Sequence, residues 1–159
     1  MPDLADDDRL TLWGLFLEAF HGLEDGLLAD LDGVFSYPPA FFEVLLRVAR
    51  TPGHAVPMTQ LANMVLFSSG GFTKLADRME AAGLIERVPC PTDRRKLLAT
   101  ITPEGERVLE KALKVHVPSI DRRLVEPLTV EERAQLESIL RKLRDPYCPT
   151  DEEVDPTDG

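Results

Sequence analysis

The chain has 159 residues, enough for one domain, and 43% of them are apolar, which is sufficient for a hydrophobic core. No apolar run approaches the roughly 20 residues needed to cross a bilayer, and the first residues are acidic rather than basic. We therefore expect a soluble, cytoplasmic protein with no signal peptide and no membrane partner.

The net charge of −10 is unevenly distributed along the chain. Four aspartates lie in residues 1–8 and five acidic residues lie in 146–159, so the remainder carries −10 + 9 = −1. Residues 69–96 hold six basic and four acidic residues, a balance of 6 − 4 = +2. We expect an acidic N-terminal tail (1–8), one folded domain (9–145) and a disordered acidic tail (146–159).

Helical spacing of apolar residues predicts a long helix over residues 9–31 and a second helix over 40–50. The apolar residues of the first helix include Leu10, Leu12, Trp13, Phe16, Leu17, Phe20, Leu23, Leu27, Leu28 and Leu31. This is more apolar surface than one small domain can cover. We expect part of it to meet a second copy of the chain, and the alternative is a monomeric bundle that buries it internally.

A short helix over 59–65, a turn at 67–69 and a second helix over 69–82 follow, an order typical of a helix-turn-helix motif. One face of the second helix carries Phe72, Leu75, Ala76, Met79 and Ala82. Its opposite face carries Gly70, Thr73, Lys74, Asp77 and Ala81, with Arg78 at the edge. Such a face suits base edges and phosphates in a DNA groove. Taken alone, the pattern also fits an ordinary amphipathic core helix.

Two short strands are predicted over 85–88 and 97–101, joined by a loop with four basic residues and one acidic residue between Arg87 and Lys96. Proline residues keep this loop out of the strand ladder. A basic loop directly after a helix-turn-helix motif indicates a wing that contacts phosphates or inserts an arginine into a minor groove. A solvated loop is the alternative.

The C-terminal part begins with Thr102 as a helix cap and Pro103 at the first helical position. A long helix is expected to about Val125, kinked or divided by Pro118. A capping box from Thr129 to Glu132 opens the last helix, which ends near residue 145.

The segments from Leu75 to Arg87 and from Pro91 to Gly105 resemble the MarR family of bacterial transcriptional regulators. The matching positions are Asp77 with Arg78, Gly83 with Leu84, Asp93 with Arg94 and Arg95, and Ile101 with Thr102 and Gly105. The resemblance implies a mainly α fold with a small two-stranded β wing. A winged helix-turn-helix lobe (38–103) would be flanked by dimerisation helices (9–31 and 104–145). The chain departs from the family pattern at Cys90, where an aspartate is frequent.

The resemblance, together with the exposed face of the helix, assigns the expected DNA contacts. They are Ser68, Ser69, Gly70, Gly71, Thr73, Lys74, Arg78, Arg94, Arg95 and Lys96. Asp77 and Asp93 are expected to position the wing. An acid on a DNA-facing surface repels phosphate unless it is paired, so we expect Asp77 to bridge to Arg94 or Arg95, with the other arginine in the minor groove.

By the same resemblance, a small aromatic effector would bind between the dimerisation helices and the DNA-binding lobe. The candidate pocket residues are Trp13, Phe16, Phe20, His21 and Phe42, although such a stripe also fits a plain core. The three histidines lie in separate elements, so no metal site and no cofactor is expected. Cys90 and Cys148 form no disulfide framework. Cys90 is either a redox switch or a plain replacement.

The sequence therefore predicts a transcriptional regulator, a repressor in the commonest case, that binds a pseudo-palindromic operator in double-stranded DNA as a homodimer. No phosphate loop, nucleophile elbow or histidine–carboxylate motif is present, so an enzyme is not expected. The main alternative is a helical dimer that uses the same fold to bind proteins, without sequence-specific DNA binding.

Overall fold

The computed structural model describes the following parts of the chain: residues 6–65, 69–93 and 95–144. Two compact units are formed, Met1–Ile120 and Asp121–Gly159. The predicted disordered tail and two of the predicted DNA contacts lie outside the described residues, namely 146–159, Ser68 and Arg94.

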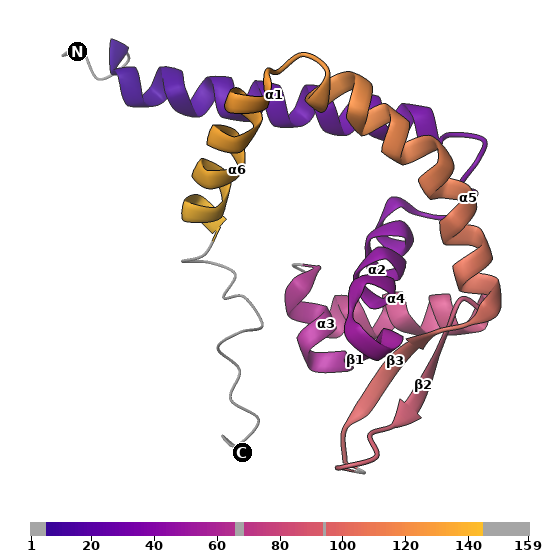
Figure 1. Ribbon diagram of the computed structural model, residues 1–159. Coiled ribbons are helices and arrows are strands. Elements are labelled where there is room, and N and C mark those ends of the chain that lie inside the picture. Colours follow the sequence, from indigo (N-terminus) through magenta and orange to yellow (C-terminus); the bar gives the residue numbers. More distant parts are fainter. Residues whose placement is uncertain (1–5, 66–68, 94, 145–159) are drawn as a thin grey trace. The chain divides into compact units, whose positions relative to one another are not determined.

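The first unit contains five α-helices within its described residues (Figure 1): α1 (Asp8–Leu31), α2 (Pro39–Arg50), α3 (Met58–Met64), α4 (Ser69–Ala81) and α5 (Pro103–Ile120). The first four match the predicted ranges to within one residue at each end. Their boundaries follow local signals, such as Pro39 in the first turn of α2, where its missing N–H costs no hydrogen bond. No helix in the described ranges is both long and apolar enough to cross a membrane.

A three-stranded antiparallel sheet completes the first unit, in the order β1-β3-β2. Its strands are β1 (Ala55–Pro57), β2 (Ile85–Pro89) and β3 (Leu97–Ile101). In the central strand, Ala99 lies opposite Val56 of β1 and Arg87 of β2. The predicted mainly α fold with a β2–β3 wing is confirmed, and β1 is an addition. A strand of three residues is too short to show an alternating pattern in the sequence.

The core of the first unit lies between α2, α3, α4 and the sheet. Its fully buried side chains include Val44, Leu45, Val48, Val56, Leu61, Ala76, Met79, Leu84 and Ile85. Burial of each large aliphatic side chain contributes about 1.5–3 kcal/mol. The core therefore holds α4 by its inner face and leaves the outer face free to meet a partner.

A tight joint links the end of α4, the start of β2 and the start of α5. Gly83 has a φ of 69°, a left-handed conformation that glycine adopts without strain, and it ends α4 in a Schellman motif. The N–H of Leu84 donates to Met79 O (3.0 Å), and the N–H of Gly83 donates to Glu80 O (2.9 Å). The chain then turns directly into β2.

Thr102 fastens α5 to this turn. Its hydroxyl donates to Gly83 O (2.6 Å) and accepts from the N–H of Gly105 (3.0 Å), while its own N–H donates to Leu84 O (3.1 Å). The predicted cap is thus also a tertiary contact. A Cβ on Gly105 would lie 2.1 Å from Leu84 O, so only glycine allows this approach.

Helices α1 and α5 of the first unit pack against each other. The hydroxyl of Ser119, a residue only 1% exposed, donates to the carboxylate of Asp30. This buried bond between α1 and α5 specifies their alignment better than apolar contacts alone.

The second unit contains a short π-helical segment (η3, Asp121–Val125) and α6 (Val130–Arg144). One helix was predicted to reach Val125. The α-helical hydrogen-bond pattern ends at Ile120 and becomes π-helical at Asp121, three residues after Pro118, which lacks an N–H donor. The predicted capping box is confirmed. The Thr129 N–H donates to Glu132 Oε2 (2.8 Å), and the Glu132 N–H donates to Thr129 Oγ1 (3.2 Å).

Replacement of Gly105 by alanine is expected to destabilise the protein by about 2 kcal/mol, because backbone atoms must move to admit the new methyl group. Urea unfolding followed by circular dichroism measures this loss. Gly22→Ala in α1 is the matched control. No atom lies within 4 Å of the added Cβ there, so helix propensity should stabilise it by up to roughly 1 kcal/mol. Equal stability of the two variants would contradict the close approach.

Candidate nucleic-acid interface

The outer face of α4 is exposed as the sequence predicted. Phe72, Leu75, Ala76 and Met79 are buried, and Thr73 and Lys74 lie in solvent together with Asp77 and Arg78. Ser69 and Gly70 open the helix, and Gly71 is half-buried in its first turn. Thr73, Lys74, Asp77 and Arg78 therefore form one exposed face of α4.

Arg78 lies at the edge of this surface and has a second contact. Its guanidinium carbon is 5.5 Å from the centroid of the Phe41 ring, which is 2% exposed on α2. A cation over an aromatic face is attracted to it, and the contact orients the side chain. Arg78 is thus held beside α2 while it remains exposed to solvent.

Arg87 of β2 holds two acidic residues of α4. It donates from Nη2 to Asp77 Oδ1 (2.6 Å), from Nε to Glu80 Oε2 (3.0 Å) and from its backbone N–H to Glu80 Oε1 (3.2 Å). Its side chain is 23% exposed. The hydrogen bond from Arg87 lowers the pKa of the Glu80 carboxyl, and the two carboxylates raise the pKa of Arg87. Both acidic residues of α4 are therefore paired.

The partner of Asp77 differs from the expected one. We expected a bridge to Arg94 or Arg95; Asp77 pairs with Arg87, Arg95 pairs with Asp93, and Arg94 lies outside the described residues. The predicted partner was therefore wrong, although Asp77 does pair with a cation. From the sequence, Arg87 was predicted only as one of the basic residues of the wing, with no partner on α4. The strand pairing that brings it to α4 is a long-range contact.

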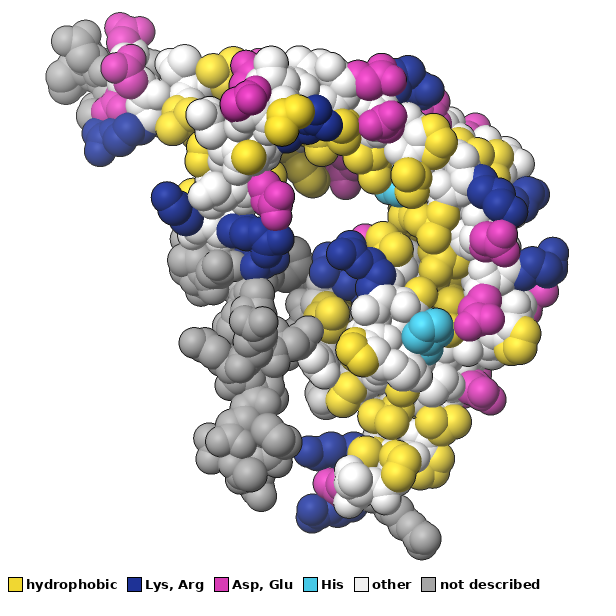
Figure 2. Space-filling view, in the orientation of Figure 1, with side chains coloured by type: hydrophobic (Ala, Val, Ile, Leu, Met, Phe, Trp, Pro, Cys, Tyr) yellow, Lys and Arg dark blue, Asp and Glu magenta, His cyan; other side chains and the backbone are white. Residues whose placement is uncertain are grey.

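The tip of the wing is organised by Asp93. Its carboxylate accepts from the N–H of Arg95 (3.0 Å) and from Arg95 Nε (3.2 Å), and its backbone oxygen accepts from the N–H of Lys96 (2.9 Å). The bond from the Arg95 N–H is the main reason that the pKa of Asp93 is lowered. The Arg95 side chain is 92% exposed. Dark-blue side chains project at this end of the β2–β3 hairpin in Figure 2.

Cys90 is partly exposed and lies where β2 leads into the loop at the tip of the wing. Its sulfur is 3.2 Å from Thr92 Oγ1, and its N–H donates to Lys96 O (2.9 Å). Hydrogen bonds from the Thr92 hydroxyl and from nearby backbone N–H groups lower the pKa of this thiol. The cysteine thus fits the wing turn in place of an aspartate, and a redox role stays a prediction.

Comparison with known proteins supports the interpretation of this surface. A sequence model of the MarR family matches residues 37–96. The multiple antibiotic resistance protein MarR of Salmonella typhimurium is 32% identical over 102 residues, which are 64% of this chain and 69% of that protein. The chain belongs to the MarR family. Other relatives, such as PecS of Dickeya dadantii, are named transcriptional regulators, so the chain is a winged helix-turn-helix, DNA-binding transcriptional regulator.

Two solved structures of MarR-family regulators from Streptomyces coelicolor share the fold. Sco3205, whose structure is a complex with DNA, is 27% identical with a TM-score of 0.79, over 90% of this chain and 89% of that one. AbsC is 28% identical with a TM-score of 0.79, over 87% of this chain and 93% of that one. The MarR fold therefore extends well beyond the matched residues 37–96.

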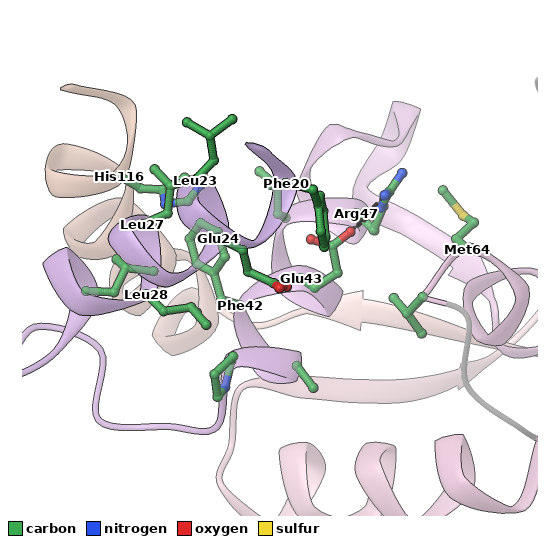
Figure 3. A pocket seen from close by; sticks show the side chains of 15 residues that line it. Phe20, Leu23, Glu24, Leu27, Leu28, Phe42, Glu43, Arg47, Met64 and His116 are labelled. Atoms are coloured by element: carbon green, nitrogen blue, oxygen red, sulfur yellow. Dashed lines mark hydrogen bonds and ion pairs between the residues drawn. The ribbon is translucent and has the colours of Figure 1, made fainter. Parts of the chain in front are cut away.

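A cavity of 660 Å³ lies between α1, α2 and α5 of this MarR-family chain (Figure 3). Two of the five predicted effector residues line it, Phe20 and Phe42. Trp13 and Phe16 stack on each other at 5.9 Å nearer the start of α1, and both are largely exposed. His21 lies beside Phe20 and faces Glu24 at 3.9 Å. Arg47 and His116 also line the cavity, and neither was among the predicted effector residues.

Replacement of Arg87 by glutamine is expected to lower the unfolding temperature by a few degrees at pH 7, because Asp77 and Glu80 lose their partner. The pKa of Glu80 lies below its ordinary value of 4.5 when folded, so its contribution is present above pH 4.5 and is lost as the pH falls through the folded pKa. The difference between wild type and variant should shrink below pH 4.5.

Differential scanning calorimetry between pH 3 and pH 7 measures this difference. Arg107→Gln is the matched control, since Arg107 pairs with Glu104 inside a single helix, three residues apart. Its effect should be smaller than that of Arg87→Gln. A pH-independent difference for Arg87→Gln would show that the ion pairs are not the source of the stabilisation.

Proposed function

We propose that this MarR-family regulator binds a pseudo-palindromic operator as a homodimer, represses transcription and is released by a small effector. The main observation behind the proposal is that the exposed face of α4 and the cationic tip of the wing belong to one lobe. Arg87 pairs with both acids on α4, Lys74 is exposed, and Arg95 is 92% exposed although it pairs with Asp93. Lys74 and Arg95 can therefore reach phosphates and bases.

The proposed DNA contacts include the first turn of α4, its outer face and the wing, with Asp77 and Asp93 in positioning roles. The contact residues are Ser68, Ser69, Gly70, Gly71, Thr73, Lys74, Arg78, Arg94, Arg95 and Lys96. The relative Sco3205 is bound to DNA in its structure, which supports the same activity here. The surplus of +2 over residues 69–96 is small, so non-specific binding should be modest and should weaken with salt.

A homodimer would explain the apolar side chains exposed on α1 and α6. On α1 they include Leu10, Leu12, Trp13, Leu15, Phe16 and Phe20, and on α6 they include Ile139, Leu140 and Leu143. An exposed apolar surface on a helix of this kind marks an interaction site. A two-fold dimer presents two α4 helices about one DNA turn apart, roughly 34 Å, which predicts a pseudo-palindromic operator.

The proposed effector site is the cavity between α1, α2 and α5. Since these helices carry both the exposed apolar surface and the DNA-binding lobe, a ligand there can favour a dimer with unsuitable spacing of its α4 helices. The ligand would then draw protein off the operator by shifting the population of dimers.

Alanine at Lys74 or at Arg95 is expected to lower operator affinity about tenfold, because each loses a phosphate or base contact. The operator is first obtained by capturing fragmented genomic DNA on the wild-type protein and sequencing what is enriched. Affinities are then compared by fluorescence anisotropy at two salt concentrations. Lys111→Ala, an exposed position on α5, is the control and should retain wild-type affinity.

If wild type and both variants recover the same random fragments with equal salt dependence, the proposed operator binding is wrong. The helical dimer that binds proteins would then be the better interpretation.

Trp13→Glu combined with Phe16→Glu is expected to convert the dimer into a monomer, because charges would enter the proposed apolar interface. Sedimentation equilibrium should give 2 × 17.7 = 35.4 kDa for the wild type and 17.7 kDa for the variant. Glu18→Gln on the same helix is the control and should remain dimeric. A monomeric wild type would instead favour a bundle that buries these helices internally.

A further inference from the structure

The cavity between α1, α2 and α5 combines apolar walls with a small set of ionisable groups. Its apolar part includes Phe20, Leu23, Leu27, Phe42, Leu46 and Met64. The volume of 660 Å³ is in the range of sites for small organic ligands. The polar groups on the wall therefore decide which ligand chemistry the cavity accepts.

Two carboxylates and one guanidinium lie on the wall of the cavity. Arg47 forms an ion pair with Glu43, as the dashed line in Figure 3 indicates. Its Nε and Nη2 atoms both lie 2.8 Å from Glu43 Oε1. Glu24 faces His21, 3.9 Å away, a residue that carries charge only when protonated. With His116 neutral, the two carboxylates and the guanidinium leave the cavity wall with a net charge of −2 + 1 = −1. The cavity is therefore electronegative.

His116 also lies on this wall. Its Nδ1 is buried and has no hydrogen-bond partner among the described residues, and its ring packs edge-on against Phe42 with 4.7 Å between centroids. Burial lowers the pKa of His116, an effect that Glu43 partly opposes. A neutral imidazole has one nitrogen that accepts a hydrogen bond, and an unsatisfied buried polar atom costs free energy that a donor on a ligand would recover.

We propose that this cavity selects an aromatic cation with N–H donors, such as an arylamidinium or a protonated aromatic amine, and excludes aromatic carboxylates. The cation would pair with Glu24, donate to His116 and lie against the rings of Phe20 and Phe42, which attract positive charge. A carboxylate would be repelled by Glu24 and could bind Arg47 only by displacing Glu43. This preference would define the chemical class of the proposed effector. Release from the operator by such a ligand rests on the proposed function.

The test compares two ligands of equal shape and opposite charge, biphenyl-4-carboxamidine and biphenyl-4-carboxylate. Isothermal titration calorimetry with the full chain, without DNA, measures both affinities. The wild type should prefer the amidine. Glu24→Gln should reduce that preference roughly threefold, a modest factor because the Glu24 side chain is about half exposed. Glu18→Gln, on α1 but outside the cavity wall, should leave the preference unchanged.

A second variant tests the role of the ion pair. Glu43→Gln frees Arg47 and should raise the affinity for the carboxylate while it lowers the affinity for the amidine. Equal or tighter binding of the carboxylate by the wild type would overturn the proposal. So would failure of both ligands to bind, or a preference that Glu24→Gln leaves unchanged.

Whether the ligand releases the protein from DNA is tested separately, by measuring operator affinity with and without the amidine. Loss of operator binding in the absence of any ligand would disprove the proposed function and leave the charge preference of the cavity intact. Operator binding that persists at saturating amidine would show that this ligand class does not release the DNA.

Discussion

The backbone approach of Gly105 to Leu84 determines how the DNA-binding elements meet the long helix α5. No side chain separates the first turn of α5 from the turn that ends α4, and Thr102 bonds to Gly83, Leu84 and Gly105 at the same place. The end of the recognition helix and the starts of β2 and α5 thus form one rigid joint. The proposed release by a ligand would need a displacement of α5 to reach α4, and this joint is where the two helices are connected.

The charge of the DNA-facing surface depends on one strand residue. Asp77 and Glu80 would repel phosphate if they were free, but Arg87 reaches both from β2. The same contacts connect α4 to the wing, so one side chain both pairs with the two acids and positions α4 against β2. An acidic chain can therefore present a mildly cationic surface, with Lys74 and Arg95 directed to solvent.

Helix α1 has two surfaces with different chemistry. Near its start, Trp13 and Phe16 stack on each other and stay exposed, which fits an apolar partner. Farther along, Phe20 and Glu24 line the cavity that also includes Glu43 and His116. If the proposed dimer forms through the exposed part of α1, a ligand in the cavity would lie on the same helix and could affect the dimer directly.

Local pattern in the sequence was sufficient for most helices and for their ends. The apolar spacing of α4, the capping box at Thr129 and the β2–β3 wing all follow from residues a few positions apart. Contacts between distant residues were decided by the tertiary structure alone. Strand β1 exists because Ala55–Pro57 pairs with β3, and Asp77 meets Arg87 because β2 turns back along α4. Likewise, His116 reaches the cavity only through the packing of α5 against α1 and α2. Periodicity describes one element at a time, and which side chains meet across elements depends on the packing of the whole unit.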